Sequence, residues 1–331
     1  MSGLPDPLLS VRTQQSRSYS SPVGQLLAFD FSSDIGDGQM ILGYAVSLSG
    51  WCLSYVTNSV SSAENLAVLG INLVPNLAGT TLYVTANAYM SDNKGDAAGS
   101  PEGAPSTMVQ VTAVALIGTS TQAGSFVGNI YQLESGATSY ETYGSPVYGG
   151  FLSGFMLTSN DPGSVGSIAL NAAASGPGSS FTLSGSATTT DVTTTGTVDA
   201  FAFAYPYPYP SASGTPPFAN FQIVQASVSW SAPSSSGMTG QFSATFTPPS
   251  GMSIIQWGVL VNALTFDYTK SELQFVQFQF VENFPTSPPY GGSNTVSGQV
   301  VMNIYNPDGV PDWIESTSSA VFSVIAQFGP S

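Results

Sequence analysis

Positive charge is nearly missing from this sequence. Its 331 residues include 4 Lys and Arg residues against 19 Asp and Glu residues, so the net charge is −15 at neutral pH. A folded basic face that neutralises phosphates needs several cations, which excludes nucleic-acid binding of this kind and disfavours anionic lipid surfaces. Charged residues make up only 7% of the chain, against roughly 25% in an average soluble domain.

A surface with so few charges must be kept in solution by Ser, Thr, Asn, Gln and Gly. Two settings favour it. One is an acidic external environment, where carboxylates are protonated and a Lys-rich surface would repel itself. The other is a protein covered largely by copies of itself, because charges buried between copies are costly. A surface composition that drifted without functional meaning is the alternative to both.

Histidine is absent, and Cys52 is the only cysteine. These absences exclude a Ser-His-Asp triad, a Cys-His pair, histidine metal sites, an intramolecular disulfide and a zinc cluster. Cys52 stands between Trp51 and Leu53, which indicates a small buried hydrophobic residue. No GxxxxGK[ST] phosphate-binding motif occurs. We therefore expect no cofactor and no enzymatic activity.

Targeting signals and long hydrophobic runs are also absent. No basic segment followed by an apolar stretch opens the chain, and no run of about 20 apolar residues occurs. No asparagine stands in an Asn-x-Ser/Thr sequon, so nothing indicates a glycosylated secretory protein. We expect neither a signal peptide nor a transmembrane span, as for a particle component released by lysis.

Alternating apolar and polar residues, typical of β-strands, extend over most of the chain. In 80–90, for example, Leu82 and Val84 alternate with Tyr83 and Thr85. Turn sequences rich in Pro, Gly and Asn separate such segments, which predicts an all-β sandwich or barrel. The only helix candidate is 61–69. We expect strands within 40–56, 66–74, 80–90, 107–118, 126–133, 147–159, 166–174, 179–205, 221–232, 240–248, 253–268, 271–284, 296–306 and 320–329.

Residues 1–24 combine prolines and polar residues without a sustained period. This pattern predicts an N-terminal arm rather than a regular element. Arg12 and Arg17, half of the cations, lie in it. They are interface candidates if the arm docks on a neighbour; the alternative is a frayed tail.

A second unusual segment follows residue 204. Tyr205, Tyr207 and Tyr209 each precede a proline, and alternating Tyr-Pro favours extended polyproline II. We interpret 205–217 as a connector between a first jelly-roll or sandwich part, 25–204, and a second, 218–331. The three tyrosines are interface candidates because their rings offer rigid contact area with one polar tip. An ordinary extended loop is the alternative.

Paired carboxylates are the remaining candidates for chemistry. Two carboxyl groups can serve glycoside hydrolysis or acid proteolysis, but turns use Asp for local hydrogen bonds, and we interpret these pairs as turns. Asp92 and Asp96, in "SDNKGD", are also calcium candidates, although the distal Glu of a calcium loop is missing. The three pairs are Asp34/Asp37, Asp92/Asp96 and Asp308/Asp312.

Two β-sandwich parts in tandem behind an N-terminal arm resemble the double jelly-roll major capsid proteins of icosahedral viruses. The resemblance is one of architecture over 25–331 and includes no diagnostic motif. It implies two eight-stranded rolls and trimeric capsomers. We therefore expect a self-assembling structural protein of the virion, a capsid, vertex or spike subunit, whose partners are copies of itself, as a trimer or another homo-oligomer, and other particle proteins.

Two other classes of function are left open. The Ser/Thr-rich stretch 179–199 resembles the insertion hairpin of β-pore formers, so one alternative is a secreted, extracellular pore-forming or lectin-like binding protein. The other is an acid-stable hydrolase that uses Asp and Glu alone.

Overall fold

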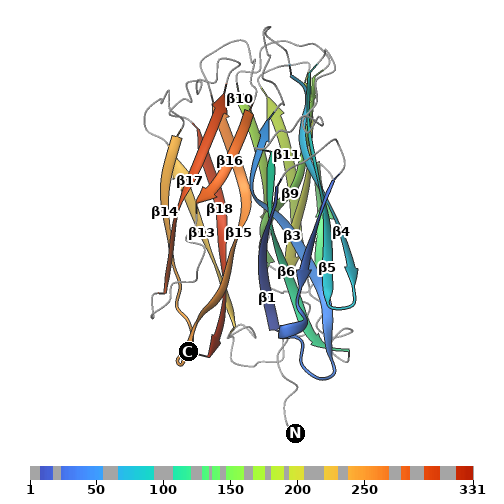
Figure 1. The fold of residues 1–331 in the computed structure, drawn as a ribbon, viewed down its shortest axis with the longest axis vertical. Coiled ribbons are helices and arrows are strands. Elements are labelled where there is room, and N and C mark those ends of the chain that lie inside the picture. Colours follow the sequence, from blue (N-terminus) through green and yellow to red (C-terminus); the bar gives the residue numbers. More distant parts are fainter. Residues whose placement is uncertain are drawn as a thin grey trace.

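The described part of the computed structural model is almost entirely β-structure (Figure 1). The only helical element within it is a 3-10 turn, η1 (Ser32–Asp34). The all-β class predicted from the alternating pattern is confirmed. The described residues are 8–17, 24–54, 66–92, 107–120, 129–133, 136–141, 147–159, 167–175, 180–189, 194–204, 220–229, 238–267, 277–283, 294–305 and 318–330.

The described strands fall into three consecutive groups of six, which we call units 1, 2 and 3. Unit 1 contains β1 (Leu8–Arg17), β2 (Gln25–Asp30), β3 (Gln39–Ser54), β4 (Leu66–Ala78), β5 (Thr81–Asp92) and β6 (Met108–Thr119). Unit 2 contains β7 (Asn129–Leu133), β8 (Gly136–Glu141), β9 (Val147–Ser159), β10 (Ser167–Ser175), β11 (Ser180–Thr189) and β12 (Thr194–Ala204). Unit 3 contains β13 (Phe221–Ser229), β14 (Met238–Thr245), β15 (Met252–Asp267), β16 (Gln277–Asn283), β17 (Thr295–Tyr305) and β18 (Ser319–Pro330).

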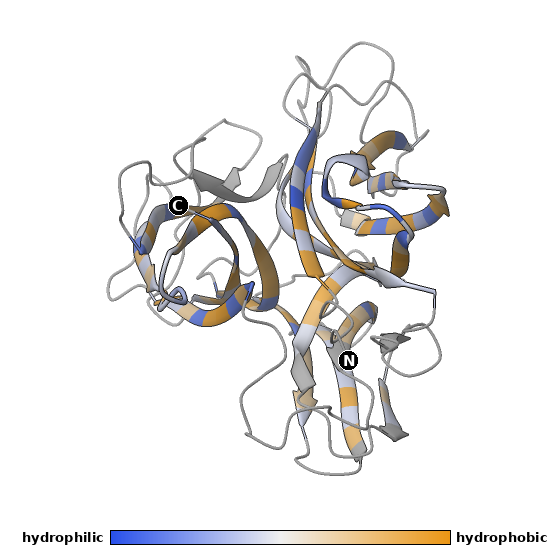
Figure 2. Cartoon of the chain, turned by 90° about the horizontal axis from the view of Figure 1, so that it is seen from below, coloured by the Kyte–Doolittle hydropathy of each residue, from blue (hydrophilic) through white to orange (hydrophobic). Residues whose placement is uncertain are grey.

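Each unit divides its strands between two sheets in the same way. The three six-stranded sheets have the orders β1-β6-β3-β16-β17-β14, β13-β18-β15-β10-β11-β8 and β2-β5-β4-β9-β12-β7. In every sheet, the first, sixth and third strands of one unit form one half, and the fourth, fifth and second strands of another unit form the other half. The two halves meet where a third strand pairs with a fourth strand. The joins are β3 with β16, β15 with β10, and β9 with β4. The exchange therefore closes a ring of three units, visible along the long axis as three lobes (Figure 2).

A bulge at the same place in each third strand shows that the three units are equivalent. The register against the sixth strand skips one residue in each case: Ser49 in β3, Ser153 in β9 and Asn262 in β15. A bulge bends its strand and increases the local twist, so three equivalent bulges give the third strands a common shape. We use these residues to align the units.

The third strands lie at the centre of the ring. β3, β9 and β15 contact one another, and the rings of Trp51 and Phe155, each two residues after its bulge, lie 5.5 Å apart. All neighbouring strands are antiparallel, so odd-numbered strands run one way along the long axis and even-numbered strands the other. The start of β1 and the end of β18 consequently lie at one end of the body (Figure 1).

Apolar side chains form two clusters. The larger one fills the space between the sheets and includes residues from all three units. The smaller one, which we call the seam cluster, also draws on all three units. Burying side chains from different units in one cluster makes their folding interdependent. The seam cluster contains Leu9, Val11, Val114, Leu116, Phe151, Phe221, Leu260 and Ile325.

Strand β6 shows why parts of the sequence lack an alternation of apolar and polar residues. In β6, Ala113 and Ala115 belong to the larger cluster, whereas Val114 and Leu116 belong to the seam cluster. Both faces of this strand are therefore buried, and strands buried on both faces are near-continuous apolar runs. The backbone of unit 3 also comes close at this point, because a Cβ at Gly258 of β15 would lie 2.6 Å from the Thr112 side chain.

The prediction of an arm without a regular element over 1–24 is wrong for residues 8–17. These residues form β1, which pairs with β6 along its whole length. Leu9 and Val11 are buried in the seam cluster. Leu9 and Val11 are the only apolar residues of this strand that face the core. Two positions are too few to reveal a period of two in the sequence, and the strand is held by tertiary packing instead.

The division into two tandem parts stays a prediction. Two of the three sheets contain strands from both sides of 205–217, so the parts 25–204 and 218–331 are not separated by sheet membership. The connector itself, with Tyr205, Tyr207 and Tyr209, lies outside the described residues. In the helix candidate 61–69, residues 66–69 belong to strand β4 and the others are not described.

Candidate functional site

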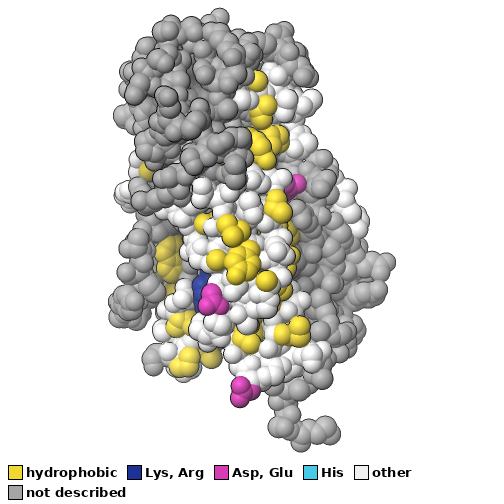
Figure 3. All heavy atoms as spheres, turned by 45° about the vertical axis from the view of Figure 1, so that its right-hand side comes forward, with side chains coloured by type: hydrophobic (Ala, Val, Ile, Leu, Met, Phe, Trp, Pro, Cys, Tyr) yellow, Lys and Arg dark blue, Asp and Glu magenta, His cyan; other side chains and the backbone are white. Residues whose placement is uncertain are grey.

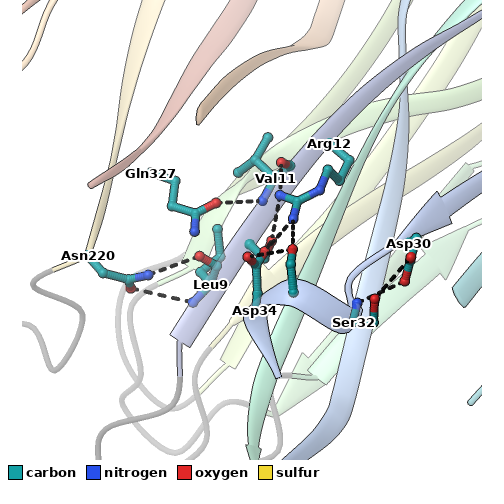
Figure 4. A network of polar contacts seen from close by, with 10 residues as sticks. Leu9, Val11, Arg12, Asp30, Ser32, Asp34, Asn220 and Gln327 are labelled. Carbon is teal, nitrogen blue, oxygen red and sulfur yellow. Dashed lines mark hydrogen bonds and ion pairs between the residues drawn. The ribbon is translucent and has the colours of Figure 1, made fainter. Parts of the chain in front are cut away.

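Arg12 lies in a polar cluster that ties β1 to the turn after β2 (Figure 4). Its guanidinium is 2.6 Å from the carboxylate of Asp34, and its central carbon lies 5.5 Å from the centre of the Phe31 ring. The Ser10 hydroxyl donates to the same carboxylate. Arg12 is thus engaged within the chain. Its role at an interface stays a prediction, as does that of Arg17, whose side chain is not described.

The free edge of β1 is covered by two side chains of unit 3 (Figure 4). The Leu9 N–H donates to Asn220 Oδ1 (3.4 Å), and Asn220 Nδ2 donates to the Leu9 carbonyl (2.9 Å). The Val11 N–H donates to Gln327 Oε1 (3.0 Å). An uncovered edge strand invites pairing with another chain, so these contacts both close the ring and protect this part of the edge.

Asp30 caps the η1 turn that carries Asp34. The Ser32 N–H and the Ser32 hydroxyl donate to its two carboxylate oxygens, at 2.9 and 3.0 Å. These hydrogen bonds hold the pKa of Asp30 below its ordinary value, with a smaller contribution from Arg12. The charged form is favoured because both donors point at it.

The predicted carboxylate pairs are not assembled into a site within the described residues. The Asp34 carboxylate is bound by Arg12 and Ser10, and Asp37 is exposed in the turn after η1. Asp92 is the last residue of β5, but its side chain, like Asp96, Asp308 and Asp312, lies outside the described residues. No group of three or more His, Cys, Asp or Glu side chains that could hold a metal occurs in the part of the chain that is described.

A groove of about 710 Å³ lies at the join between units 1 and 2. The pairing of β4 with β9 ends at Asn72 and Gly154, whereas β4 continues to Ala78. Tyr44 reaches the groove from β3 of the neighbouring sheet. The described lining residues are Tyr44, Ile71, Asn72, Leu73, Val74, Pro75, Phe155, Met156, Thr197 and Asp199.

Asn72, Gly154 and Asp199 form a row across β4, β9 and β12. Directly opposed residues share a face of the sheet, and the middle one has no side chain. A Cβ at Gly154 would lie 2.8 Å from the Ile71 carbonyl and 3.0 Å from Asp199 Oδ2. The carboxylate of Asp199 therefore lies close over the backbone of Gly154, where a larger residue would collide with it.

The described lining can bind but lacks a pair of catalytic groups. Asp199 is its only ionisable carboxyl group, whereas glycoside hydrolysis needs two. Around it are the polar groups of Asn72, Thr197 and Tyr44 and the apolar surfaces of Val74, Pro75 and Met156.

The equivalent positions of the other two joins differ. Between units 2 and 3 the row is Asn171, Ala263 and Val321. In β3 the equivalent glycine, Gly50, lies opposite Gln110. Of the sixth-strand residues at these three positions, Asp199, Val321 and Gln110, only Asp199 is acidic.

Sequence reasoning missed the groove because its residues come from four strands that are far apart in the chain. One signal was available. Leu48-Ser49-Gly50-Trp51 and Leu152-Ser153-Gly154-Phe155 repeat the pattern Leu-Ser-Gly-aromatic, and both mark the bulge of a third strand.

The sequence matches no protein-family model, and no curated protein matches it. Within the described residues, no helix is long and apolar enough to cross a membrane.

Proposed function

We propose that the protein is a non-enzymatic structural subunit of a virion or another extracellular particle, and that it works as an assembly of copies of itself. The observation that carries the proposal is the exchange of half-sheets among three units. The exchange makes one chain a closed, three-lobed body with long strands along a common axis. Such a body suits a mechanical role at a capsid, vertex or spike.

The described surface supports contact with other copies. Of the four Lys and Arg residues, Arg12 alone has a described side chain, and it is in an ion pair. The face in Figure 3 accordingly shows few charged groups among hydrophobic and neutral polar ones. The cores of protein–protein interfaces are depleted in charge, so a surface of this kind loses little electrostatic solvation when it is covered.

One row of exposed apolar residues marks a contact surface. Leu26 of β2 and Val74 of β4 lie on either side of Thr85 in β5, and they are 63% and 51% exposed. β2 is also the edge strand of its sheet. An exposed edge beside exposed apolar side chains favours pairing with another copy.

The pore-forming and hydrolase alternatives receive less support. β11 and β12, which contain most of the stretch 179–199, belong to different sheets and do not pair, so that stretch does not form a hairpin here. The described carboxylates are not brought together as a hydrolase requires. The proposal also does not depend on the double jelly-roll resemblance, because the described strands form three sets of six.

Sedimentation velocity and negative-stain electron microscopy of the purified protein test this function. We expect oligomers or particles at micromolar concentration, and we expect Leu26→Ser to dissociate them without lowering the melting temperature. Met40→Ser is the matched control, since Met40 is 48% exposed but lies outside this row. A monomer that persists at micromolar concentration from acidic to neutral pH would overturn the proposal.

A further inference from the structure

We propose that the groove between units 1 and 2 binds a neutral saccharide. The inference concerns a ligand site that shares one residue, Val74, with the proposed contact surface between copies. It rests on the groove's size, its charge, its mixture of polar and apolar groups, and the residues that replace its polar row at the join between units 2 and 3.

The volume of the groove is in the range of small-molecule sites. A volume of about 710 Å³ lies within the roughly 300–1,000 Å³ of small-molecule sites. The groove runs along the outer edge of the β4–β9 pairing, with Tyr44 contributed by a second sheet. An elongated ligand can therefore lie along the strands and contact two sheets at once.

The charge of the groove and of the whole chain narrows the chemical class of the ligand. Asp199 is the only acidic residue among the described lining residues, no Lys or Arg is included, and the chain carries a net charge of −15. An anionic ligand would be repelled by both the site and the whole molecule. Hydroxyl groups are good partners for the site, because a carboxylate accepts their hydrogen bonds strongly.

The lining combines the two kinds of surface that a sugar ring presents. Asn72 can donate and accept, Thr197 and Tyr44 supply hydroxyl groups, and Asp199 accepts. Val74, Pro75 and Met156 give apolar area on which the C–H face of a ring can pack. An extended apolar ligand would leave the polar groups of this lining without partners, which costs binding free energy.

The comparison between units indicates that the polar row of the groove is not a by-product of the sheet join. At the equivalent row between units 2 and 3, Asn171 retains the amide, but Ala263 replaces the glycine and Val321 replaces the aspartate. The same strand pairing therefore exists there without the carboxylate. Only one of the two rows has the polar groups that a saccharide needs.

The test uses the full-length protein and a panel of neutral trisaccharides: maltotriose, cellotriose, mannotriose and tri-N-acetylchitotriose. Sialyllactose is the anionic comparison and spermidine the cationic one. Saturation-transfer NMR identifies binders, and calorimetric titration measures their affinity. We expect at least one neutral trisaccharide to bind, and we expect Asp199→Asn and Asn72→Ala each to weaken it about tenfold, as the loss of one well-made hydrogen bond would.

Asn171→Ala is the matched control, because Asn171 occupies the position of Asn72 in the next unit and does not line the groove. It should leave affinity unchanged, and all three variants should keep the wild-type melting temperature to within a few degrees. The proposal is overturned if no neutral trisaccharide binds, if spermidine or sialyllactose binds in preference, or if Asn171→Ala weakens binding as much as Asn72→Ala does.

Discussion

Leu8 and Leu9 are adjacent on β1 but have opposite surroundings. Leu8 is 38% exposed, whereas Leu9 is 2% exposed and packs in the seam cluster. We expect Leu9→Ala to lower the free energy of unfolding by about 2–4 kcal/mol, because it leaves a cavity where the units meet. Leu8→Ala should change it by less than about 0.5 kcal/mol. Urea unfolding of both variants measures the difference.

Equal effects at the two leucines would mean that β1 is not a packed strand. The comparison separates loss of core packing from loss of strand propensity, because both variants make the same chemical change in the same strand.

The stability of the folded protein depends on pH through Asp30. Its pKa is lowered mainly by the hydrogen bonds from Ser32, so the folded state favours the carboxylate. The resulting stabilisation is complete above the ordinary pKa of Asp and is lost as the pH falls through the lowered pKa of the folded state. We expect the melting temperature to fall more for the wild type than for Asp30→Asn between about pH 5 and pH 2.

Thermal unfolding followed by circular dichroism at the two pH values gives the comparison, and an NMR titration of the Asp30 carboxyl carbon gives its pKa directly. Identical losses in wild type and variant, or a pKa at the ordinary value, would contradict the assignment. Ser32→Ala should raise this pKa toward the ordinary value by removing one of the two donors.

Individual strands were the most predictable elements. Ranges such as 80–90 and 320–329 coincide closely with β5 and β18, because burial on one or both faces leaves a clear trace in the sequence. β1 and β8 were not predicted. Within β8, Gly136 and Ser139 are exposed, and this edge strand is positioned by pairing with β11, which has no local signature.

The three bulges provide a prediction at the scale of the strand. Asn262 donates to the Gly150 carbonyl (2.5 Å) and accepts from the Ser323 hydroxyl (2.9 Å). The hydroxyl groups of Ser49 and Ser153 are buried and have no hydrogen-bond partner among the described residues. We expect Asn262→Ala to lower the free energy of unfolding by about 2–3 kcal/mol, since it leaves two buried polar groups unpaired.

Ser49→Ala and Ser153→Ala make the same kind of truncation at equivalent positions and should be neutral or slightly stabilising. Chemical denaturation of the three variants tests this order. If the two serine variants lost as much stability as Asn262→Ala, the bulges would depend on the hydroxyl groups, contrary to the contacts described.

At the scale of the whole molecule, the exchange of half-sheets predicts that a unit cannot fold alone. Residues 1–120 contain all of unit 1, but they leave β3 without β16 and β4 without β9. We expect this fragment to be unfolded as a monomer, or to form trimers in which copies of unit 1 take the places of units 2 and 3. Sedimentation combined with circular dichroism distinguishes the states, and a stable folded monomer would contradict the prediction.

The ring of units was not predictable from periodicity. Alternation reveals which residues of a strand face inward, but the partner strand is chosen between segments far apart in the chain, as for Gly154 and Asn72 of the groove, which are 82 residues apart. The Leu-Ser-Gly-aromatic repeat is preserved in units 1 and 2, whereas unit 3 has Val261-Asn262-Ala263-Leu264. The equivalence is conserved in geometry more than in residue type.

The shared direction of the odd-numbered strands gives the molecule a polarity that bears on how it could be attached. The start of β1 and the end of β18 lie at one end. The end of the second strand and the start of the third lie there too in each unit, as do the end of the fourth and the start of the fifth. The strand ends bounding 55–65, 93–106, 230–237 and 306–317 lie at the opposite end. A tether next to the start of β1 or the end of β18 would therefore hold the same end inward, so that peptides inserted beside the strand ends at the other end would be displayed away from the anchored surface.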